Sequence, residues 1–226
     1  MRRRLLLERH DKATGDAVLK QDGARRVTRV RLDAEGWAVV KQEPLRGLGG
    51  WLRAVARRTR AQRSAAGHQA LIAAGFEAPG LLDAIREPGR LLTVWEHVPG
   101  PTLHVAWSTP DRGRQRGLAR AAATFAARLH TAGLSARDLK PANLIVTVLD
   151  VPVLVDLDDV VSTPSDLDLR VRNLASLDAY GQRAEPPLGV AARWRALEAY
   201  CAATGADPRE LVRAVLPASR AKRRRG

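Results

Sequence analysis

The sequence predicts an α+β protein with two lobes, a first lobe built on a small antiparallel sheet and a mainly helical, shortened second lobe. Three observations lead to this prediction. Short apolar runs between turn residues fill the first part of the chain, amphipathic patterns of helical period fill the last part, and a hairpin-like stretch with polar ends lies at residues 134–158. We place the first lobe at residues 1–97 and the second at residues 98–226.

Composition limits the protein class. The 226 residues are enough to bury a core, and 45% of them are hydrophobic, as in globular proteins. The single cysteine, Cys201, excludes an internal disulfide and a cysteine-rich zinc site. The basic start resembles a signal peptide, but the apolar run behind it is only Leu5 to Leu7, too short for secretion. We therefore expect a cytoplasmic protein.

The net charge of +14 implies attraction to polyanions, either nucleic acid, anionic lipid or phosphorylated glycan. Nucleic acid is the weaker expectation, because no nucleic-acid motif accompanies the charge and only 4% of residues are aromatic. Residues 46–63 read RGLGGWLRAVARRTRAQR and predict a basic helix. That helix is either a solvated face of the first lobe or a contact with an anionic membrane surface, and a peripheral position at the inner membrane stays open.

In the first lobe, strands are expected at residues 17–20, 27–32 and 37–41, with turns at Asp22-Gly23 and at 33–36. A helix follows through residues 64–74 and stops at Gly75, a residue type favoured just after a helix. Residues 76–82 read as a connector. A further strand is expected at 91–95, with a hinge at 96–100.

In the second lobe, residues 112–129 carry a continuous apolar stripe at helical spacing and predict a core helix. His130 is expected to cap the end of that helix. Three further helices are expected around 170–177, at 190–203 and at 208–216, followed by a frayed basic tail at 220–226.

The stretch between these helices carries the chemistry. Residues 144–149 and 153–155 predict a hairpin that brings Asn143 and Asp156 together, with Asp138 nearby on the preceding loop. Carboxylate and amide oxygens at strand ends suit Mg²⁺, and with Lys140 they are the parts of a phosphoryl-transfer site. The alternative is a turn with a few capping polar residues.

The segment ARDLKPANL resembles the catalytic loop of the protein-kinase superfamily, with Ala136 where those kinases have a His. Asp156-Leu157-Asp158 stands where their metal-binding Asp-Phe-Gly triplet is expected. A two-lobed protein-kinase-like fold is what this resemblance implies. The outer stretches AAGFEAP, VWEHVPGPTL and RNLASL are similar to the bacterial lipopolysaccharide kinases, which phosphorylate core heptose or Kdo sugars.

The resemblance implies roles for four residues of the second lobe. Asp138 would be the catalytic base that accepts the hydroxyl proton. Lys140 would contact the transferred phosphate. Asn143 and Asp156 would bind Mg²⁺ together with the nucleotide.

It also implies an ATP site in the first lobe. Lys41, at the end of its third strand, would pair with the α- and β-phosphates. Gly23 lies in the turn where kinases have their glycine-rich phosphate lid. The backbones of Glu96 and Val98 would hydrogen-bond the adenine.

Two features depart from a protein kinase. The helix before Gly75 has no Glu to pair with Lys41, since no acidic residue occurs between Glu43 and Glu77, and Gln62 near the expected place has no charge. Little room is left for an activation segment after Asp158, which argues for an acceptor other than protein.

The resulting hypothesis is a monomeric enzyme that transfers the γ-phosphoryl group of ATP to a sugar hydroxyl, with an anionic glycolipid of the lipopolysaccharide core as acceptor. Two alternatives stay open. One is a pseudokinase that serves as a nucleotide-binding scaffold, and the other is a protein Ser/Thr kinase.

Overall fold

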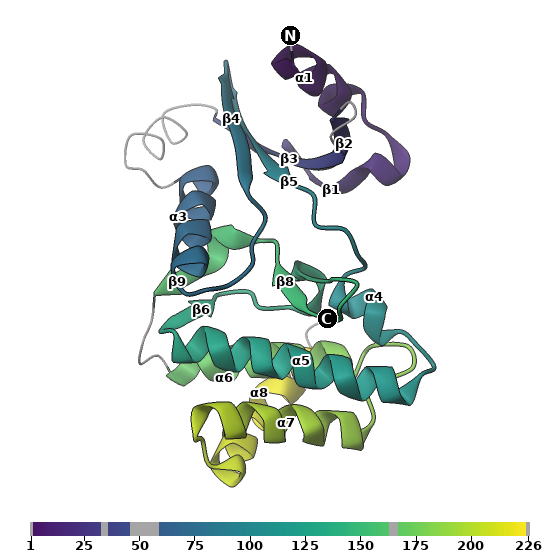
Figure 1. Ribbon diagram of the computed structural model, residues 1–226, viewed down its shortest axis with the longest axis vertical. Coiled ribbons are helices and arrows are strands. Elements are labelled where there is room, and N and C mark those ends of the chain that lie inside the picture. Colours follow the sequence, from purple (N-terminus) through teal and green to yellow (C-terminus); the bar gives the residue numbers. More distant parts are fainter. Residues whose placement is uncertain (1, 33–35, 46–58, 163–166, 225–226) are drawn as a thin grey trace. The chain divides into compact units, whose positions relative to one another are not determined.

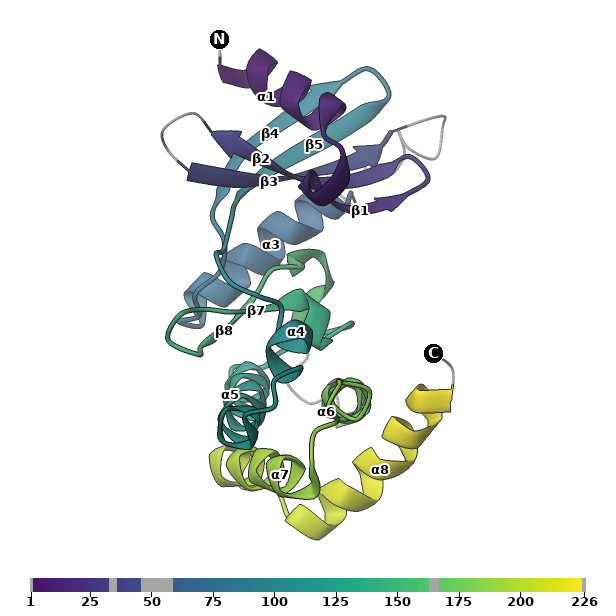
Figure 2. The same ribbon diagram turned by 90° about the vertical axis from the view of Figure 1, so that its right-hand side faces the viewer.

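The computed structural model describes residues 2–32, 36–45, 59–162 and 167–224. Within these residues the chain forms a five-stranded antiparallel sheet, two two-stranded sheets and seven α-helices, so the α+β class is confirmed (Figures 1 and 2). The chain divides into two compact units. The sheet unit comprises Met1–Gln69 and Ala78–His97, and the helical unit comprises Ala70–Glu77 and Val98–Gly226.

The large sheet belongs to the sheet unit and has the order β1-β2-β3-β5-β4, with every neighbouring pair antiparallel. Side chains alternate between its faces, and one face buries a cluster that includes Val30, Val40 and Leu92. The strands expected at 17–20, 27–32, 37–41 and 91–95 are present. The strand bounds are β1 Val18–Asp22, β2 Arg25–Leu32, β3 Gly36–Pro44, β4 Leu81–Glu87 and β5 Arg90–Glu96.

A helix that the sequence analysis did not predict, α1 (Arg2–Lys12), covers this apolar face (Figure 2). Leu6 and Leu7 of the supposed signal-like run pack on the sheet cluster. His10 is fully buried, with Nδ1 at 2.7 Å from the Thr28 hydroxyl and Nε2 at 3.2 Å from the Gln42 side-chain oxygen. The leucines at the start of the chain are therefore core residues.

Ion pairs between distant segments hold α1 and β4 in place. Arg3 binds Asp83 of β4 at 2.7 Å, and Arg90 at the start of β5 binds Asp11 at 2.6 Å. Strand β4 was missed, because the connector expected at 76–82 ends where the strand begins. Its pairing with β5 is tertiary and has no local sequence signal.

The basic stretch at 46–63 is described only from residue 59 onward, where α3 (Arg60–Ala73) begins. Residues 46–58, and with them most of the predicted basic helix, lie outside the described residues, as do residues 163–166, which follow the Asp156-Leu157-Asp158 triplet. The helix expected at 64–74 corresponds to α3, and Gly75 follows it in the left-handed conformation, with φ +75°.

The helical unit is built around α5 (Arg112–Thr131), whose buried stripe includes Leu118, Phe125 and Leu129, as predicted. Asp111 begins the helix by accepting hydrogen bonds from the Gly113 and Arg114 amides. The other helices are α4 (Leu103–Trp107), α6 (Leu167–Gly181), α7 (Val190–Thr204) and α8 (Pro208–Arg224), and α6 packs against α8. No helix of the described part of the chain is both long and apolar enough to cross a membrane.

Helix α8 corrects two expectations, a helix end at residue 216 and a frayed tail at residues 220–226. It continues through Pro217 to Arg224. Its last turn is held from outside, because Arg183 Nη2 donates to the carbonyl oxygens of Lys222 at 2.8 Å and Arg223 at 2.7 Å. A cation that binds the last carbonyls of a helix satisfies acceptors that have no partner within the helix.

The carboxylate of Asp178 on α6 connects three helical segments. It accepts from Arg193 Nε of α7 at 2.6 Å, from Gln182 at 2.7 Å and from the Ser219 hydroxyl of α8. Only 16% of its side chain is exposed. We predict that Asp178→Ala lowers the free energy of unfolding by about 3 kcal/mol, since it leaves a half-buried guanidinium uncompensated.

Urea denaturation followed by circular dichroism measures this effect. Glu198→Ala is the matched control, because its ion pair with Arg195 is exposed and should contribute less than about 1 kcal/mol. Equal losses in the two variants would contradict the role assigned to Asp178.

Candidate active site

The predicted hairpin is present, with a shorter first strand than expected. Strand β7 (Leu144–Val146) pairs with β8 (Pro152–Leu154), and the turn begins at Thr147 rather than after residue 149. Asp150 adopts the left-handed conformation there, with φ +56°. At the other end, the Val155 amide donates to the Asn143 carbonyl at 3.0 Å, so the residue before Asp156 is fixed beside Asn143.

The loop before the hairpin folds onto the same point. Asn143 closes a short 3-10 turn (Pro141–Asn143), and its side-chain Nδ2 donates to the backbone carbonyl of Asp138 at 3.1 Å. This bond orients the amide, so its Oδ1 is left as the acceptor. The structure therefore brings Asp138 and Asn143 together as the sequence predicted, within one compact unit.

Asp138 and Lys140 form an ion pair that the sequence analysis did not foresee. Lys140 Nζ lies 2.5 Å from Asp138 Oδ2, with 27% and 40% of the two side chains exposed. Burial acts against the charged ammonium, but the hydrogen bond to Asp138 and the carboxylates of Asp138 and Asp156 outweigh it and raise the pKa of Lys140. The Asp156 carboxylate is thus close enough to Lys140 to influence its charge.

The chemistry of these groups fits Mg²⁺. The expected ligands are the Asn143 amide oxygen and the Asp156 carboxylate, both hard oxygen donors. The described residues contain no group of three or more His, Cys, Asp or Glu side chains that could hold a metal ion. Mg²⁺ in phosphoryl-transfer sites takes only one or two protein carboxylates and completes its shell with water and substrate phosphate, so two ligands suit that use.

Behind the loop lies a buried chain of hydrogen bonds that corrects the expectation for His130. Its side chain is 1% exposed and does not cap α5. The Tyr200 hydroxyl of α7 lies 2.8 Å from His130 Nδ1, and His130 Nε2 lies 3.1 Å from Asn173 Oδ1 of α6. Asn173 Nδ2 in turn donates to the carbonyl oxygen of Ala136.

These contacts assign the tautomer of His130. Because Asn173 uses its NH₂ group on Ala136, its oxygen faces the imidazole and Nε2 must carry the proton. Nδ1 is then the acceptor for the Tyr200 hydroxyl. Ala136 ends the short strand β6 (Leu134–Ala136), which pairs with β9 (Val160–Ser162), and Asp138 follows two residues later. The RNLASL stretch quoted for the resemblance contains Asn173, but the sequence analysis gave neither Asn173 nor Tyr200 a role.

The predicted nucleotide residues lie on the sheet unit, apart from Val98, the first residue of the helical segment 98–226. Lys41 lies on β3, paired with Val27 and Thr93. By strand alternation it shares a sheet face with Glu43, whose carboxylate accepts from the first amide of α3 at 2.9 Å. Lys41 is therefore on the face opposite α1.

The backbone around two other predicted nucleotide-binding residues, Gly23 and Glu96, is fixed by local structure. Gly23 occupies the β1–β2 turn with φ +55°, a conformation that glycine adopts without strain. The Glu96 amide donates to the Gly80 carbonyl at 2.9 Å and the Glu96 carboxylate accepts from the Gly80 amide. Since that amide is already used, the Glu96 carbonyl is the group left to meet an adenine.

Gln62 has a defined structural task. Its side-chain oxygen accepts from the Thr59 amide at 3.1 Å, and the Thr59 hydroxyl accepts from the Gln62 amide at 3.2 Å. This reciprocal pair is a capping box that begins α3. Gln62 is therefore engaged at the start of the helix.

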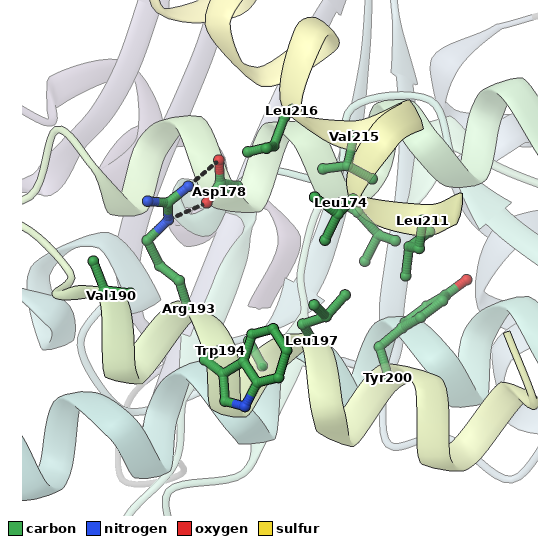
Figure 3. A pocket seen from close by; sticks show the side chains of 12 residues that line it. Leu174, Asp178, Val190, Arg193, Trp194, Leu197, Tyr200, Leu211, Val215 and Leu216 are labelled. Atoms are coloured by element: carbon green, nitrogen blue, oxygen red, sulfur yellow. Dashed lines mark hydrogen bonds and ion pairs between the residues drawn. The ribbon is translucent and has the colours of Figure 1, made fainter. Parts of the chain in front are cut away.

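Elsewhere in the helical unit, a hollow of about 290 Å³ opens between α6, α7 and α8 (Figure 3). Its walls are hydrocarbon, with Trp194, Leu197 and Leu216 among the side chains that line it. The one charged pair there, Asp178 with Arg193, is internally matched. The Asp178 carboxylate and the Tyr200 hydroxyl that line it are engaged with Arg193, Ser219 and His130, so this hollow is not the candidate active site.

In comparisons with known proteins, no family model and no curated protein matches the chain. The lipopolysaccharide-kinase resemblance stays a prediction, carried by the residues quoted for it.

The buried His130 gives a testable pH dependence. Burial lowers its pKa from 6.5 to about 4, although the hydrogen bond with Asn173 acts in the opposite direction. A base whose pKa is lowered by folding binds its proton more readily in the unfolded chain. The neutral His130 therefore makes its full contribution to the free energy of unfolding above pH 6.5, and this contribution is lost between pH 6.5 and about 4. The difference corresponds to about 3 kcal/mol.

We expect wild type to lose about that much more unfolding free energy than His130→Gln between pH 7.5 and pH 4. Urea titrations at several pH values measure it. His68 on α3 is half-buried and contacts Trp95, so His68→Gln is unsuitable as a control. The exposed Arg220→Gln variant serves instead. Parallel pH curves for wild type and His130→Gln would contradict the assignment.

Proposed function

We propose that the chain is an ATP-dependent phosphotransferase with a protein-kinase-like fold, which transfers the γ-phosphoryl group to a sugar hydroxyl. The observation that carries the proposal is the convergence of Asp138, Lys140 and Asn143 in one loop, with Asp156 next to Val155 beside it. A hydroxyl-proton acceptor, a phosphate-contacting ammonium and two oxygen ligands are the groups that such a reaction uses.

Asp138 is the residue assigned to the acceptor. Its carboxylate would position the sugar hydroxyl for in-line attack and take the proton as the oxygen–phosphorus bond forms. Lys140 Nζ lies 2.5 Å from that carboxylate and would orient it toward the hydroxyl. The same ammonium is placed to contact the phosphoryl group as it moves toward the acceptor.

ATP and Mg²⁺ would supply the phosphoryl group and neutralise the charge that develops on its oxygens. Asn143 and Asp156 would hold the metal, and Lys41 the α- and β-phosphates. The five-stranded sheet, with a helix following the Lys41 strand, supports the sheet unit as the nucleotide-binding lobe. Most of the rate gain would come from positioning and electrostatics.

The acceptor we propose is a sugar of the lipopolysaccharide core, presented at the inner membrane. The net charge of +14 supports an anionic glycolipid over a neutral acceptor. The short interval after Asp158 supports a sugar over a peptide, because little chain is available to form a peptide-docking segment.

A second candidate is a nucleotide-binding protein without transfer activity. The capping role of Gln62 favours it, because that residue was the nearest substitute for the missing glutamate partner of Lys41. This candidate shares ATP binding with the first and differs in turnover alone.

We predict that Asp138→Asn lowers Mg²⁺-dependent turnover of ATP by about 100- to 10,000-fold, because it removes the proton acceptor. Asp156→Asn should abolish turnover and weaken Mg·ATP binding. The matched control is Asp150→Asn, an exposed carboxylate of the same hairpin whose ion pair is with Arg114.

Phosphate release from ATP, with and without a lipopolysaccharide acceptor, measures turnover. Equal rates in wild type and the two site variants would remove the enzyme hypothesis. Unchanged ATP binding without any turnover in wild type would favour the second candidate.

For Lys41, we predict that Lys41→Met weakens ATP binding about tenfold or more, since a phosphate-contacting ammonium is lost. Fluorescence titration with an ATP analogue in the presence of Mg²⁺ measures it. Lys20→Met on β1, also exposed to solvent, removes the same charge from the sheet and should change binding less than twofold. If both variants bind ATP equally well, Lys41 is not a phosphate ligand.

A further inference from the structure

The last turn of α8 carries Lys222, whose ammonium group lies on α6 near the candidate active site. Lys222 Nζ donates to the Ser176 hydroxyl of α6 at 3.0 Å, and Ser176 is itself buried. Helix α8 packs across α6, which is seen end-on in Figure 2. Lys222 is half-buried there, although the sequence placed it in a solvated tail.

The position of Lys222 is fixed by its backbone as well as its side chain. Arg183 donates to the carbonyls of Lys222 and Arg223, and its guanidinium stacks over the Tyr180 ring at 5.6 Å. Tyr180 lies on α6, which contacts both α8 and the Pro141–Asn143 turn of the loop. Residues of α6, α8 and the catalytic loop therefore meet in one place.

Lys222 adds positive charge to this place. Lys140 is already paired with Asp138 at 2.5 Å, and Lys222 brings a second ammonium to α6, the helix that also packs against the Pro141–Asn143 turn, while Arg183 binds the Lys222 carbonyl. Burial lowers the pKa of Lys222; Asp138 opposes that effect, while Lys140 and Arg183 add to it. Within residues 2–32, 36–45, 59–162 and 167–224, no carboxylate lies at ion-pair distance from Lys222.

We infer that Lys222 and Arg183 form an anion subsite beside Asp138, which binds a phosphate or carboxylate group carried by the acceptor. The role of Asp138 in this inference rests on the proposed function, whereas anion binding itself does not. A substrate anion would provide charge-assisted hydrogen bonds to an ammonium that has only a neutral hydroxyl as partner. It would thereby hold the neighbouring sugar hydroxyl at the base, where positioning counts most.

The test is the binding of small anions to the full chain at constant ionic strength, measured by calorimetry. The probes are inorganic phosphate, glucose 6-phosphate, glucuronate and uncharged glucose. We expect at least one of the two anionic sugars to bind, and glucose not to bind. Comparison of glucose 6-phosphate with glucuronate then shows whether the subsite prefers a phosphate or a carboxylate. Lys222→Met should weaken anion binding on the order of tenfold.

Two variants make the result specific. Arg220→Met removes one positive charge from the exposed side of the same helix and should change anion binding less than twofold. Lys222→Arg keeps the charge and should retain most of the affinity. Thermal unfolding of each variant confirms that the helix remains folded.

Equal weakening by Lys222→Met and Arg220→Met would overturn the inference, because attraction would then be non-specific. Failure of wild type to bind any anionic probe would overturn it too. These outcomes are distinct from failure of the phosphotransferase proposal. Anion binding that depends on Lys222 in a protein without ATP turnover would support the subsite and reject the enzyme.

Discussion

The candidate active site depends on a buried chain of hydrogen bonds from Tyr200 through His130 and Asn173 to the Ala136 carbonyl. Each polar group in this chain is buried or nearly so, and each has its partner, which makes a network rigid rather than costly. Three helices thereby fix the strand that precedes Asp138. In the proposed kinase-like loop, His130 of α5 and Asn173 of α6 would take over the scaffold function of the loop histidine, whose position Ala136 occupies here.

This hydrogen-bonded network requires a neutral His130. His130 is held in one tautomer, with a donor on one side and an acceptor on the other. A charged imidazole would present two donors, and the Tyr200 hydroxyl would have to turn away. The low-dielectric interior that strengthens the bonds also keeps the proton off His130, so orientation and protonation state are set by the same burial.

Much of the fold could be predicted from local patterns, because they arise from burial within a few residues. The alternation through β3 and the apolar stripe of α5 are of this kind. The hairpin β7–β8 was recognisable for the same reason. Helix α1 was not, because its three leucines are too few for a helical stripe and become informative only against the sheet cluster.

The residues of the candidate site likewise fall into those that local sequence patterns could predict and those that they could not. The spacing from Asp138 to Asn143 and Asp156 was visible in the sequence, since a short loop and a hairpin bring these residues together locally. The contributions of Asn173, Arg183 and Lys222 were not, because these residues lie 35 or more positions after Asp138 along the chain. Proline ends most helices, but contacts of Ser219 and Lys222 with α6 maintain α8 beyond Pro217.

The end of α8 has a practical consequence for anyone who handles this protein. The last described turn of α8 contacts α6 through Lys222 and Ser176, and α6 packs against the proposed catalytic loop. Cleavage among the arginines of this turn by a trypsin-like protease during purification would remove that contact. Samples in which an intact mass shows this turn to be uncut are the ones in which activity should be sought.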